Sequence, residues 1–506
     1  MLGNSSSTSP SPRQSERWYG GHLFFAGALI GYWVFVAAFV DAHEIRVVHD
    51  DAFINYVYAR NLAEGMGPVF NVGERVWGYT SPAQVLLLAT GIALGADVES
   101  FATACGFAFA CVSGFLVFCL LRRVTREDLA AALGAAYLIT LAPIFSLHVT
   151  LEGNFLIASQ LLFLEVLLRG RVSTAAVLGG LSCLVRPDSI VLVLPALLLY
   201  RTGRRPLSIL LFGLPGLLWI AFTGAYYGSI VPTTLWAKSG ASDFFGYVTS
   251  MAYFTFGPGF PGNVLELEMD ATGWCLAAAK LALLLLGARA SSRIGPAAGY
   301  ALVVYPFVLL LAYAWIGAPQ HHWEIQSASF FFHLGAVAGL LALLGETQLP
   351  RPAWLRALRF AAALAAIALV TSNLTATTRF LIEQRSWAWR GAKYDLYAQI
   401  AGWVNLELPA STRLAASEVG ILGYLSEGFA VVDEVGLVSN VVGLDGRLTD
   451  AAFLASQRPD HALLAGRPRP ASYRGRRTQP LQMFVAESED AGAGAITLVR
   501  ILESGE

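Results

Sequence analysis

The sequence predicts an α-helical, polytopic membrane protein that carries a small C-terminal α/β domain. Its 506 residues are 56% hydrophobic and only 14% charged, whereas an average soluble domain is about 25% charged. Apolar runs of about 15 to 21 residues alternate with breaks that contain arginine, which is the pattern of membrane-spanning helices. The net charge is −1, so charge gives no reason to expect a nucleic-acid partner.

The N-terminal part predicts a disordered cytoplasmic segment followed by a first span. Residues 1–19 are rich in Ser and Pro, a composition typical of disorder. Arg13 and Arg17 precede the apolar run 22–40, and the positive-inside rule then puts the N-terminus in the cytoplasm. A secretory signal peptide is the alternative, but this run is longer than the usual apolar region of a signal peptide.

The arginines predict which segments of residues 20–374 cross the membrane. The run 82–95 is short for a span, and placing it on the outer surface keeps three arginine clusters on the inside together. These clusters lie at 122–126, 201–205 and 289–293. About eleven spans follow from this choice. Two of them, 173–185 and 190–200, are short, so a count that differs by two also fits.

This topology exposes four loops and the whole C-terminal tail on the outer face. The loops are 41–99, 148–154, 226–272 and 317–326. The tail, 375–506, shows a strand–helix–strand pattern at 414–438 and a further strand pattern at 496–503. We therefore expect an extracytoplasmic α/β domain. Its basic patch at 467–477 suits an acidic polymer or a phosphate group.

The first outer loop contains the stretch in which we expect chemistry. Residues 48–82 form a polar, turn-rich insert, and the adjacent acids Asp50 and Asp51 begin a predicted surface helix that ends before Gly65. Helix capping explains one acid, but two adjacent acids at a membrane face favour an enzymatic role, in which one takes a proton from a hydroxyl group. The loop also contains four candidate binding residues, Tyr56, Arg60, Arg75 and Tyr79.

The next surface helix is predicted to begin at Ser81 and Pro82. Serine is a favoured N-cap, and proline is favoured at the first helical position. The amide groups at this helix N-terminus are able to hold an anion such as phosphate. An ordinary cap is the equal alternative.

Several charged residues fall at the predicted outer ends of spans. They are Glu152, Arg186, Asp188 and Lys238. Cations on the outer side break the positive-inside trend, which favours a role such as phosphate binding. Pairing of Arg186 with Asp188 is the alternative. Lys280 lies about two turns inside its span, where a lysine is a functional candidate and snorkelling to the interface is the alternative.

The outer sequence His321-His322-Trp323-Glu324 suggests either a metal site or a stacking surface. Two adjacent histidines are poor co-ligands without further partners, so we favour stacking of Trp323 on a sugar or a prenyl phosphate, with His322 among its polar neighbours. The five cysteines have no paired spacing, which indicates buried thiols rather than disulfides or metal ligands. No metal ligand or cofactor is assigned, and dependence on a divalent metal stays open.

These residues resemble a known family. The sequence DDAFINYVYARNLAEGMGPVFNVGERVWGYTSP is similar to the first outer loop of bacterial glycosyltransferases with the GT-C fold. It is most similar to the arabinofuranosyltransferase-like group of actinobacterial cell walls, whose members contain DDAF/Y, Y-A-x-N-L, G-x-G and FN-x-G-E-R-x-x-G-Y-T. LEGN at 151–154, LVRPD at 184–188, YYGSIVPTTLWAK at 226–238 and VVDEVGLVS in the tail also agree. The resemblance covers most of residues 22–440.

The resemblance implies two juxtamembrane helices and a location in the bacterial inner membrane. It also implies transfer of a sugar from a polyprenyl-phosphate donor to a cell-envelope glycan or lipid acceptor on the outer face, with inversion. By position, Asp50 corresponds to the general base and Asp51 to its acidic neighbour. Related enzymes carry a lysine before the second juxtamembrane helix, where this chain has Thr80-Ser81. Three other cations are therefore candidates for the phosphate contact: Lys238, Arg186 and Lys280.

Two other classes of protein are the alternatives. A transporter or flippase of lipid-linked sugars favours acids at the bilayer midplane and internal repeats. In this sequence the acids cluster at one face, and no repeat is evident. A non-catalytic partner that binds a glycan through the tail is the other alternative, and the intact Asp50 argues against it.

Overall fold

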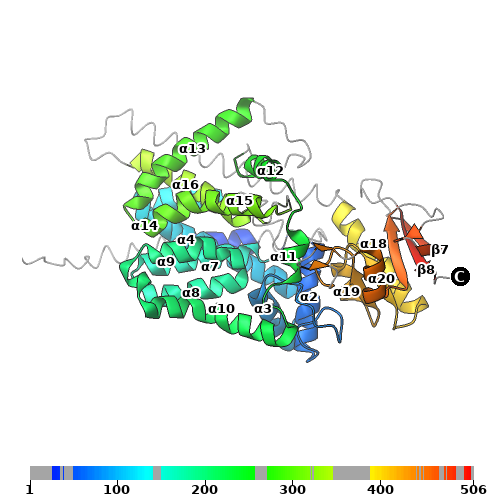
Figure 1. The fold of residues 1–506 in the computed structure, drawn as a ribbon. Coiled ribbons are helices and arrows are strands. Elements are labelled where there is room, and N and C mark those ends of the chain that lie inside the picture. The colour runs from blue at the N-terminus through cyan, green and yellow to red at the C-terminus, as the bar shows by residue number, and fades with distance from the viewer. Residues whose placement is uncertain are drawn as a thin grey trace, which may run out of the picture.

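The computed structural model shows a helical bundle next to a small mixed α/β tail, with the first outer loop between them (Figure 1). The structure describes residues 25–34, 38, 49–140, 150–256, 271–319, 321, 324–345, 388–439, 442–443, 446–447, 449–465, 472–474, 476–485 and 495–502. The expected disordered N-terminus, 1–19, and the expected last span, 357–372, lie outside these residues. His322 and Trp323 also lie outside them.

The bundle consists of helices of unequal length. They are Phe25–Val34, α4 (Val98–Thr125), α5 (Asp128–Thr140), α7 (Gly153–Leu168), α8 (Val172–Val185), η1 (Pro187–Ser189), α9 (Ile190–Leu198), η2 (Arg201–Arg204), α10 (Pro206–Tyr227), α12 (Phe244–Phe256), α13 (Ala271–Ser292), α14 (Pro296–Gly299), η3 (Tyr300–Val304), α15 (Tyr305–Ile316) and α16 (Gln326–Gly345). Within the described residues, α4, α10 and the continuous segment Pro296–Ile316 are long and apolar enough to cross a membrane. The count of about eleven spans stays a prediction.

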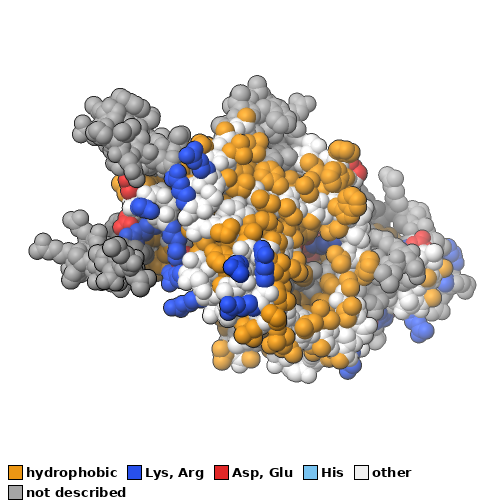
Figure 2. All heavy atoms as spheres, turned by 60° about the vertical axis from the view of Figure 1, so that its left-hand side comes forward, with side chains coloured by type: hydrophobic (Ala, Val, Ile, Leu, Met, Phe, Trp, Pro, Cys, Tyr) orange, Lys and Arg blue, Asp and Glu red, His pale blue; other side chains and the backbone are white. Residues whose placement is uncertain are grey.

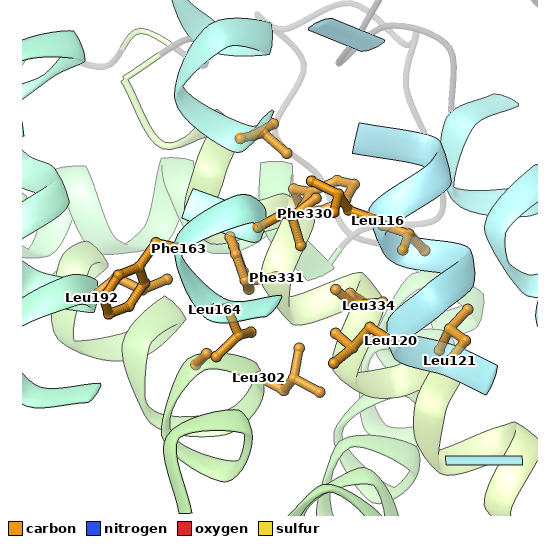
Figure 3. Close-up of a cluster of buried hydrophobic side chains, with 14 of the residues drawn as sticks. Leu116, Leu120, Leu121, Phe163, Leu164, Leu192, Leu302, Phe330, Phe331 and Leu334 are labelled. Carbon is orange, nitrogen blue, oxygen red and sulfur yellow. The ribbon is translucent and has the colours of Figure 1, made fainter. Parts of the chain in front are cut away.

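The bundle encloses one continuous apolar core, and Figure 3 shows members of it on α4, α7 and α16. Small residues bring two of its helices especially close. A Cβ atom added at Gly339 of α16 would collide with the carbonyl oxygen of Leu283 in α13, and one added at Gly335 would collide with Leu284. Close approach through small residues is how helices associate in membranes. The packing therefore fits a bilayer environment.

One end of the bundle is basic. Figure 2 shows Lys and Arg side chains gathered at the end away from the tail, beside a broad apolar surface. Arg201, Arg204 and Arg205 are exposed. The predicted pair of Arg169 with Glu165 forms at 2.7 Å, and Arg123 of α4 joins the same carboxylate at 2.7 Å. This distribution supports the proposed inside face.

The first outer loop forms the two predicted helices, α2 (Asp50–Ala63) and α3 (Pro82–Ala93). His49, with extended backbone, is the N-cap residue of α2. Asp50 is therefore the first helical residue, so the alternative of a cap on its own helix is wrong for Asp50. Ile54 and Tyr58 of this helix are buried in protein. Nearly the whole surface of α2 is covered, because the helix lies between the bundle and the tail.

The tail folds as the predicted α/β unit with a mixed sheet. Its elements are α18 (Ala388–Glu407), β1 (Arg413–Ala416), α19 (Gly420–Leu425), β2 (Ala430–Asp433), β3 (Val442–Gly443), β4 (Gly446–Arg447), α20 (Asp450–Gln457), β5 (His461–Ala465), β6 (Ser472–Tyr473), β7 (Arg476–Val485) and β8 (Ala495–Ile501). The sheet order is β2-β1-β5-β8-β7-β6, with β1 parallel to β2 and β5 and the remaining pairs antiparallel. The predicted strand–helix–strand pattern and the final strand are confirmed.

The tail shares a hydrophobic core with the first outer loop. Phe53 and Tyr56 of α2 belong to the same buried cluster as Ile421 and Leu422 of α19. The ring centroids of Phe53 and Tyr424 lie 5.2 Å apart in an edge-to-face arrangement. Deleting the tail would expose half of this core to water, so point substitutions are the sharper probe of what the tail does.

The shared core predicts that a substitution in the tail destabilises the outer loop. Leu422 is fully buried, so Leu422→Ala removes packed methyl groups and lowers the free energy of unfolding by about 2–5 kcal/mol. Thermal unfolding of the purified protein in detergent measures the change. Leu406→Ala is the matched control, since Leu406 is 84% exposed, and its effect stays within about 0.5 kcal/mol. Equal stabilities of the two variants would contradict a shared core.

Candidate active site

A buried cluster of ionised side chains lies where the ends of several bundle helices meet, on the side that the sequence predicts to face outward. Arg186, which follows α8, is its centre. The guanidinium group of Arg186 lies 2.7 Å from Glu152, 3.2 Å from Asp188 and 2.5 Å from Glu324. It also donates to the Tyr313 hydroxyl at 2.9 Å. A further helix, α11 (Thr233–Lys238), ends at Lys238, whose ammonium group lies 2.9 Å from Glu324.

Electrostatics keep this cluster ionised although it is buried. Burial lowers the pKa of Arg186, but neighbouring carboxylates, with Asp188 the strongest, raise it well above its ordinary value. Burial raises the pKa of Glu324, but Lys238 and Arg186 hold it well below its ordinary range. Burial also lowers the pKa of Lys238, but the carboxylates of Glu324 and Asp51 raise it above its ordinary value. All three groups are therefore charged at neutral pH.

The cluster has more acids than bases. Three carboxylates (Glu152, Asp188 and Glu324) face two cations (Arg186 and Lys238), which gives a formal charge of 2 − 3 = −1. The pairing of Arg186 with Asp188, which was the alternative to a phosphate-binding role, is present. Arg186 is enclosed by acids, and its side chain is 10% exposed, against 32% for Lys238. Lys238 is therefore the more accessible cation for a phosphate group.

Asp50 points to the tail. One oxygen of its carboxylate accepts the amide of Gly420 at 3.1 Å, and the other accepts the amide of Ile421 at 3.0 Å. These amides begin α19. The N-cap residue of α19, Val419, makes no capping hydrogen bond with its side chain. The side chain of Asp50 is 8% exposed. Asp50 thus caps a helix 370 residues away rather than its own.

Asp51, the next residue of α2, is half-buried. Its charge helps to raise the pKa of Lys238, after the larger effect of Glu324. Burial and Lys238 lower the pKa of His321, and Glu324 and Asp51 act against that shift. Asp51 therefore acts electrostatically on Lys238 and His321. Successive residues of a helix differ by about 100° in direction, which explains why Asp50 and Asp51 have different partners.

Two other predicted binding residues hold α2 to the tail. Arg60 donates to the carbonyl oxygens of Tyr424 at 2.6 Å and Gly423 at 3.3 Å, and its guanidinium group lies 5.5 Å from the centre of the Tyr424 ring. Tyr56 is buried, with its ring centre 6.0 Å from that of Tyr424. These contacts position the first outer loop.

Arg75 and Tyr79 hold the end of the same loop to α10. The guanidinium group of Arg75 lies 4.8 Å from the centre of the Tyr226 ring, a cation–π geometry. The Tyr79 hydroxyl lies 3.1 Å from that of Tyr227, which in turn donates to the carbonyl oxygen of Pro68 at 2.6 Å. Neither residue contacts the ion cluster within the part of the chain that the structure describes.

Ser81 and Lys280 have different surroundings. Ser81 and Pro82 occupy the predicted N-cap and first position of α3, which is confirmed. The Ser81 hydroxyl is buried, makes no capping bond, and has no hydrogen-bond partner among the described residues. The ammonium nitrogen of Lys280 lies 3.5 Å from Nε2 of His333, between α13 and α16. That contact joins two bundle helices.

A loop of the tail supports the helix that carries Lys238. The buried carboxylate of Asp433 accepts backbone amides from Val435, Leu437 and Val438, which folds the loop after β2 into a tight turn. The Thr233 hydroxyl at the start of α11 then donates to the carbonyl oxygen of Leu437 at 2.5 Å. The tail therefore helps to position Lys238.

The sequence identified part of this site. Glu324 was named only within the candidate sequence His321–Glu324 and not as a partner of Arg186, and Tyr313 was not predicted as a site residue. The positions of charged residues in the predicted outer loops are the signal that points to Glu324, whereas a tyrosine inside an apolar run gives none. Within the described residues, no group of three or more His, Cys, Asp or Glu side chains is placed to hold a metal ion.

Comparison with solved structures defines the class of this fold. The chain resembles two crystal structures of ArnT from Cupriavidus metallidurans, one bound to undecaprenyl phosphate and one in the apo state. The TM-scores are 0.55 and 0.54, over 96% and 94% of this chain and 98% of each ArnT chain, at 14% and 13% sequence identity. The protein is therefore a multi-pass membrane protein with an ArnT-like fold.

Comparison of sequences relates the chain to arabinofuranosyltransferases. In an alignment of 228 residues that covers 39% of this chain, it is 33% identical to the terminal β-(1→2)-arabinofuranosyltransferase of Mycobacterium tuberculosis. The match spans 36% of that relative's length. Residues 384–495 match a family described as a domain of unknown function (DUF8728). The predicted similarity to an arabinofuranosyltransferase is confirmed over the matched part of the chain.

The ion cluster predicts a pH-dependent contribution to stability. At neutral pH, Glu324→Gln leaves two buried cations without their shared carboxylate and lowers the free energy of unfolding by about 3–5 kcal/mol. The pKa of Glu324 is lowered in the folded protein, so its contribution is complete above its ordinary value of 4.5 and declines as the pH falls below that value. The decline is about 1.4 kcal/mol per pH unit.

Chemical unfolding in detergent at pH 7 and pH 3.5 measures this effect. The stability difference between wild type and Glu324→Gln is expected to be smaller at pH 3.5. Glu407→Gln serves as the control, because Glu407 is exposed on α18. A difference that is zero at pH 7, or the same at both pH values, would contradict the electrostatic account.

Proposed function

We propose that this chain transfers a sugar from a polyprenyl-phosphate donor to a hydroxyl group of a cell-envelope glycan or lipid. The observation that carries the proposal is the buried cluster of Arg186, Glu324 and Lys238 in an ArnT-like fold. Asp51, in the motif of the first outer loop, acts electrostatically on Lys238 of this cluster. One ArnT structure contains undecaprenyl phosphate, and the mycobacterial relative is named as an arabinofuranosyltransferase. A pentosyl unit, arabinofuranose, is therefore the best-supported sugar.

The proposed location is the bacterial inner membrane, with the N-terminus in the cytoplasm and the tail outside. Gathering of arginines at the bundle end away from the tail supports this orientation (Figure 2). A lipid-linked donor suits an outer-face site, because nucleotide sugars are absent outside the cell. The expected partners are the lipid-linked donor, the envelope acceptor and membrane lipids.

Lys238 and the N-terminus of α3 are the proposed phosphate ligands. An ammonium group has three donors, and Glu324 accepts one of those of Lys238. At the start of α3, Pro82 has no amide hydrogen and the amides of Gln84 and Val85 donate to the Ser81 carbonyl oxygen, so the Ser81 hydroxyl is the proposed donor there. Positive charge and fixed donors stabilise the negative charge that develops on the leaving phosphate. Arg186 acts indirectly, by holding Glu324 in place.

Asp51 is the proposed general base. It takes the proton of the acceptor hydroxyl as that oxygen forms a bond to the anomeric carbon. The bond from this carbon to the phosphate oxygen breaks on the opposite face, and its electron pair stays with the phosphate. Configuration at the anomeric carbon is inverted.

The position of Asp50 in the sequence motif favours Asp50 as the base. The hydrogen bonds that Asp50 makes to α19 favour Asp51 instead. Both oxygens of Asp50 accept amides of α19, and the side chain is buried. A carboxylate held in this way is a weak proton acceptor, because hydrogen bonds to the charged form favour that form. Asp50 then has a positioning role, and its neighbour remains available for the acceptor.

Paired substitutions separate these roles. Asp51→Asn is expected to lower transfer by about 10²- to 10⁴-fold with unchanged thermal stability. Asp50→Asn offers one oxygen and one amide group to two donors, so one amide of α19 loses its acceptor at a cost of about 1–3 kcal/mol. Transfer from a radiolabelled polyprenyl-phosphate arabinofuranose, measured beside thermal unfolding, tests both expectations.

Three outcomes would count against the proposal. If Asp50→Asn abolishes transfer at unchanged stability while Asp51→Asn transfers normally, the base is Asp50. If both variants transfer normally, base catalysis by this pair fails. If the purified wild type transfers neither a pentose nor a hexose from polyprenyl phosphate, the proposed function fails.

The donor site predicts a specific effect of the lysine. Lys238→Gln keeps a polar side chain but removes the charge, and kcat/KM for the donor is expected to fall by about 10²-fold. Lys238→Arg restores the charge and should recover part of this loss. Steady-state kinetics over a range of donor concentrations measure both. Equal kinetics for Lys238→Gln and wild type would remove Lys238 from the donor site.

A further inference from the structure

A cavity of about 450 Å³ lies between the end of α2, the turn after it and the loop that joins α19 to β2. It lies at the junction of the first outer loop and the tail, and the ion cluster contributes none of its lining residues. Its volume falls within the range of small-molecule sites, about 300–1,000 Å³. We infer that this cavity binds a neutral sugar unit of an extended acceptor. The inference rests on the proposed function and names the acceptor class.

The charges of the cavity select against an anionic ligand. Arg413 is paired with Glu74 at 2.7 Å, and Arg60 donates to backbone carbonyl oxygens. Glu64 and Glu427 also line the cavity, are exposed, and form no ion pair within the described part of the chain. The lining thus has three carboxylates and two cations, so it repels a phosphate or an acidic glycan.

The same lining suits a neutral, hydroxyl-rich molecule. The carboxylates of Glu64 and Glu427 are able to accept hydrogen bonds from sugar hydroxyl groups, and bonds to a charged acceptor are the stronger kind. The buried rings of Phe70 and Phe429 give the cavity an apolar wall against which the C–H groups of a sugar ring can pack.

The walls of the cavity are already fixed. Asn71 donates to the carbonyl oxygen of Val431 at 2.9 Å and accepts the amide of the same residue at 3.1 Å, so it pairs with the edge of β2 as a strand would. Asn61 donates to the carbonyl oxygens of Val69 and Phe70. A ligand therefore binds without ordering the loops first, which favours affinity.

Distance along α2 assigns the cavity to a remote part of the acceptor. Arg60 follows Asp51 by nine residues, which corresponds to about 14 Å of helical rise. A sugar in the cavity is too far from Asp51 to be the one that is attacked. A long acceptor therefore reaches from Asp51 to the cavity, whereas the shortest acceptors do not.

The experiment compares two acceptor lengths in the purified full-length protein. The donor is polyprenyl-phosphate arabinofuranose, and the acceptors are a neutral octyl arabinofuranosyl disaccharide and the corresponding hexasaccharide. Glu427→Gln and Glu64→Gln are each expected to raise KM for the hexasaccharide about tenfold, as loss of a hydrogen bond to a charged group does. The kcat and the KM for the disaccharide stay unchanged. Glu407→Gln, outside the cavity, leaves both acceptors unaffected.

Binding gives a second readout that does not depend on activity. Saturation-transfer NMR with the hexasaccharide should show binding to wild type and weaker binding to Glu427→Gln. Equal rises in KM for both acceptors, or unchanged KM and unchanged binding for the hexasaccharide, would overturn the inference. If wild type binds the hexasaccharide but transfers no sugar, sugar binding in the cavity is supported and the proposed function fails.

Discussion

Both oxygens of the Asp50 carboxylate accept backbone amides of α19, and the arrangement of the outer site depends on this contact. It fixes the start of α2 against the tail and closes the core that contains Phe53 and Leu422. Gly420 makes the approach feasible, because a Cβ atom there would collide with the carbonyl oxygen of Asp50. With Asp50 held in place, helix geometry turns Asp51 away from it by about 100°, and the charge of Asp51 acts on Lys238.

The ion cluster supplies the second constraint. A buried guanidinium group is stable only with its carboxylates in place, so Arg186 holds together α8, the start of α7 and the loop before α16. Lys238 joins this network through Glu324, and the tail supports it through Thr233 and Leu437. The tail and the bundle therefore both position residues of one site, although the sequence predicts residues 375–506 as a separate domain.

Local patterns predicted the helices and the β1–α19–β2 unit, because hydrophobic periodicity and turn residues encode them. They also predicted the pair of Arg186 and Asp188, which are two residues apart. The contact of Asp50 with Gly420 joins residues 370 positions apart, and that of Arg186 with Glu324 joins residues 138 apart. No local pattern encodes such contacts, so the sequence identified the acids of the motif but not the different role that each one takes.

Hydrogen exchange of the α19 amides tests the central claim most directly. Mass spectrometry would follow exchange in the peptide that contains residues 419–425, in wild type, Asp50→Asn and Asp51→Asn. The account predicts faster exchange at Gly420 and Ile421 in Asp50→Asn alone, because only that variant disturbs their acceptor. Unchanged exchange in Asp50→Asn, or equal acceleration in Asp51→Asn, would contradict it.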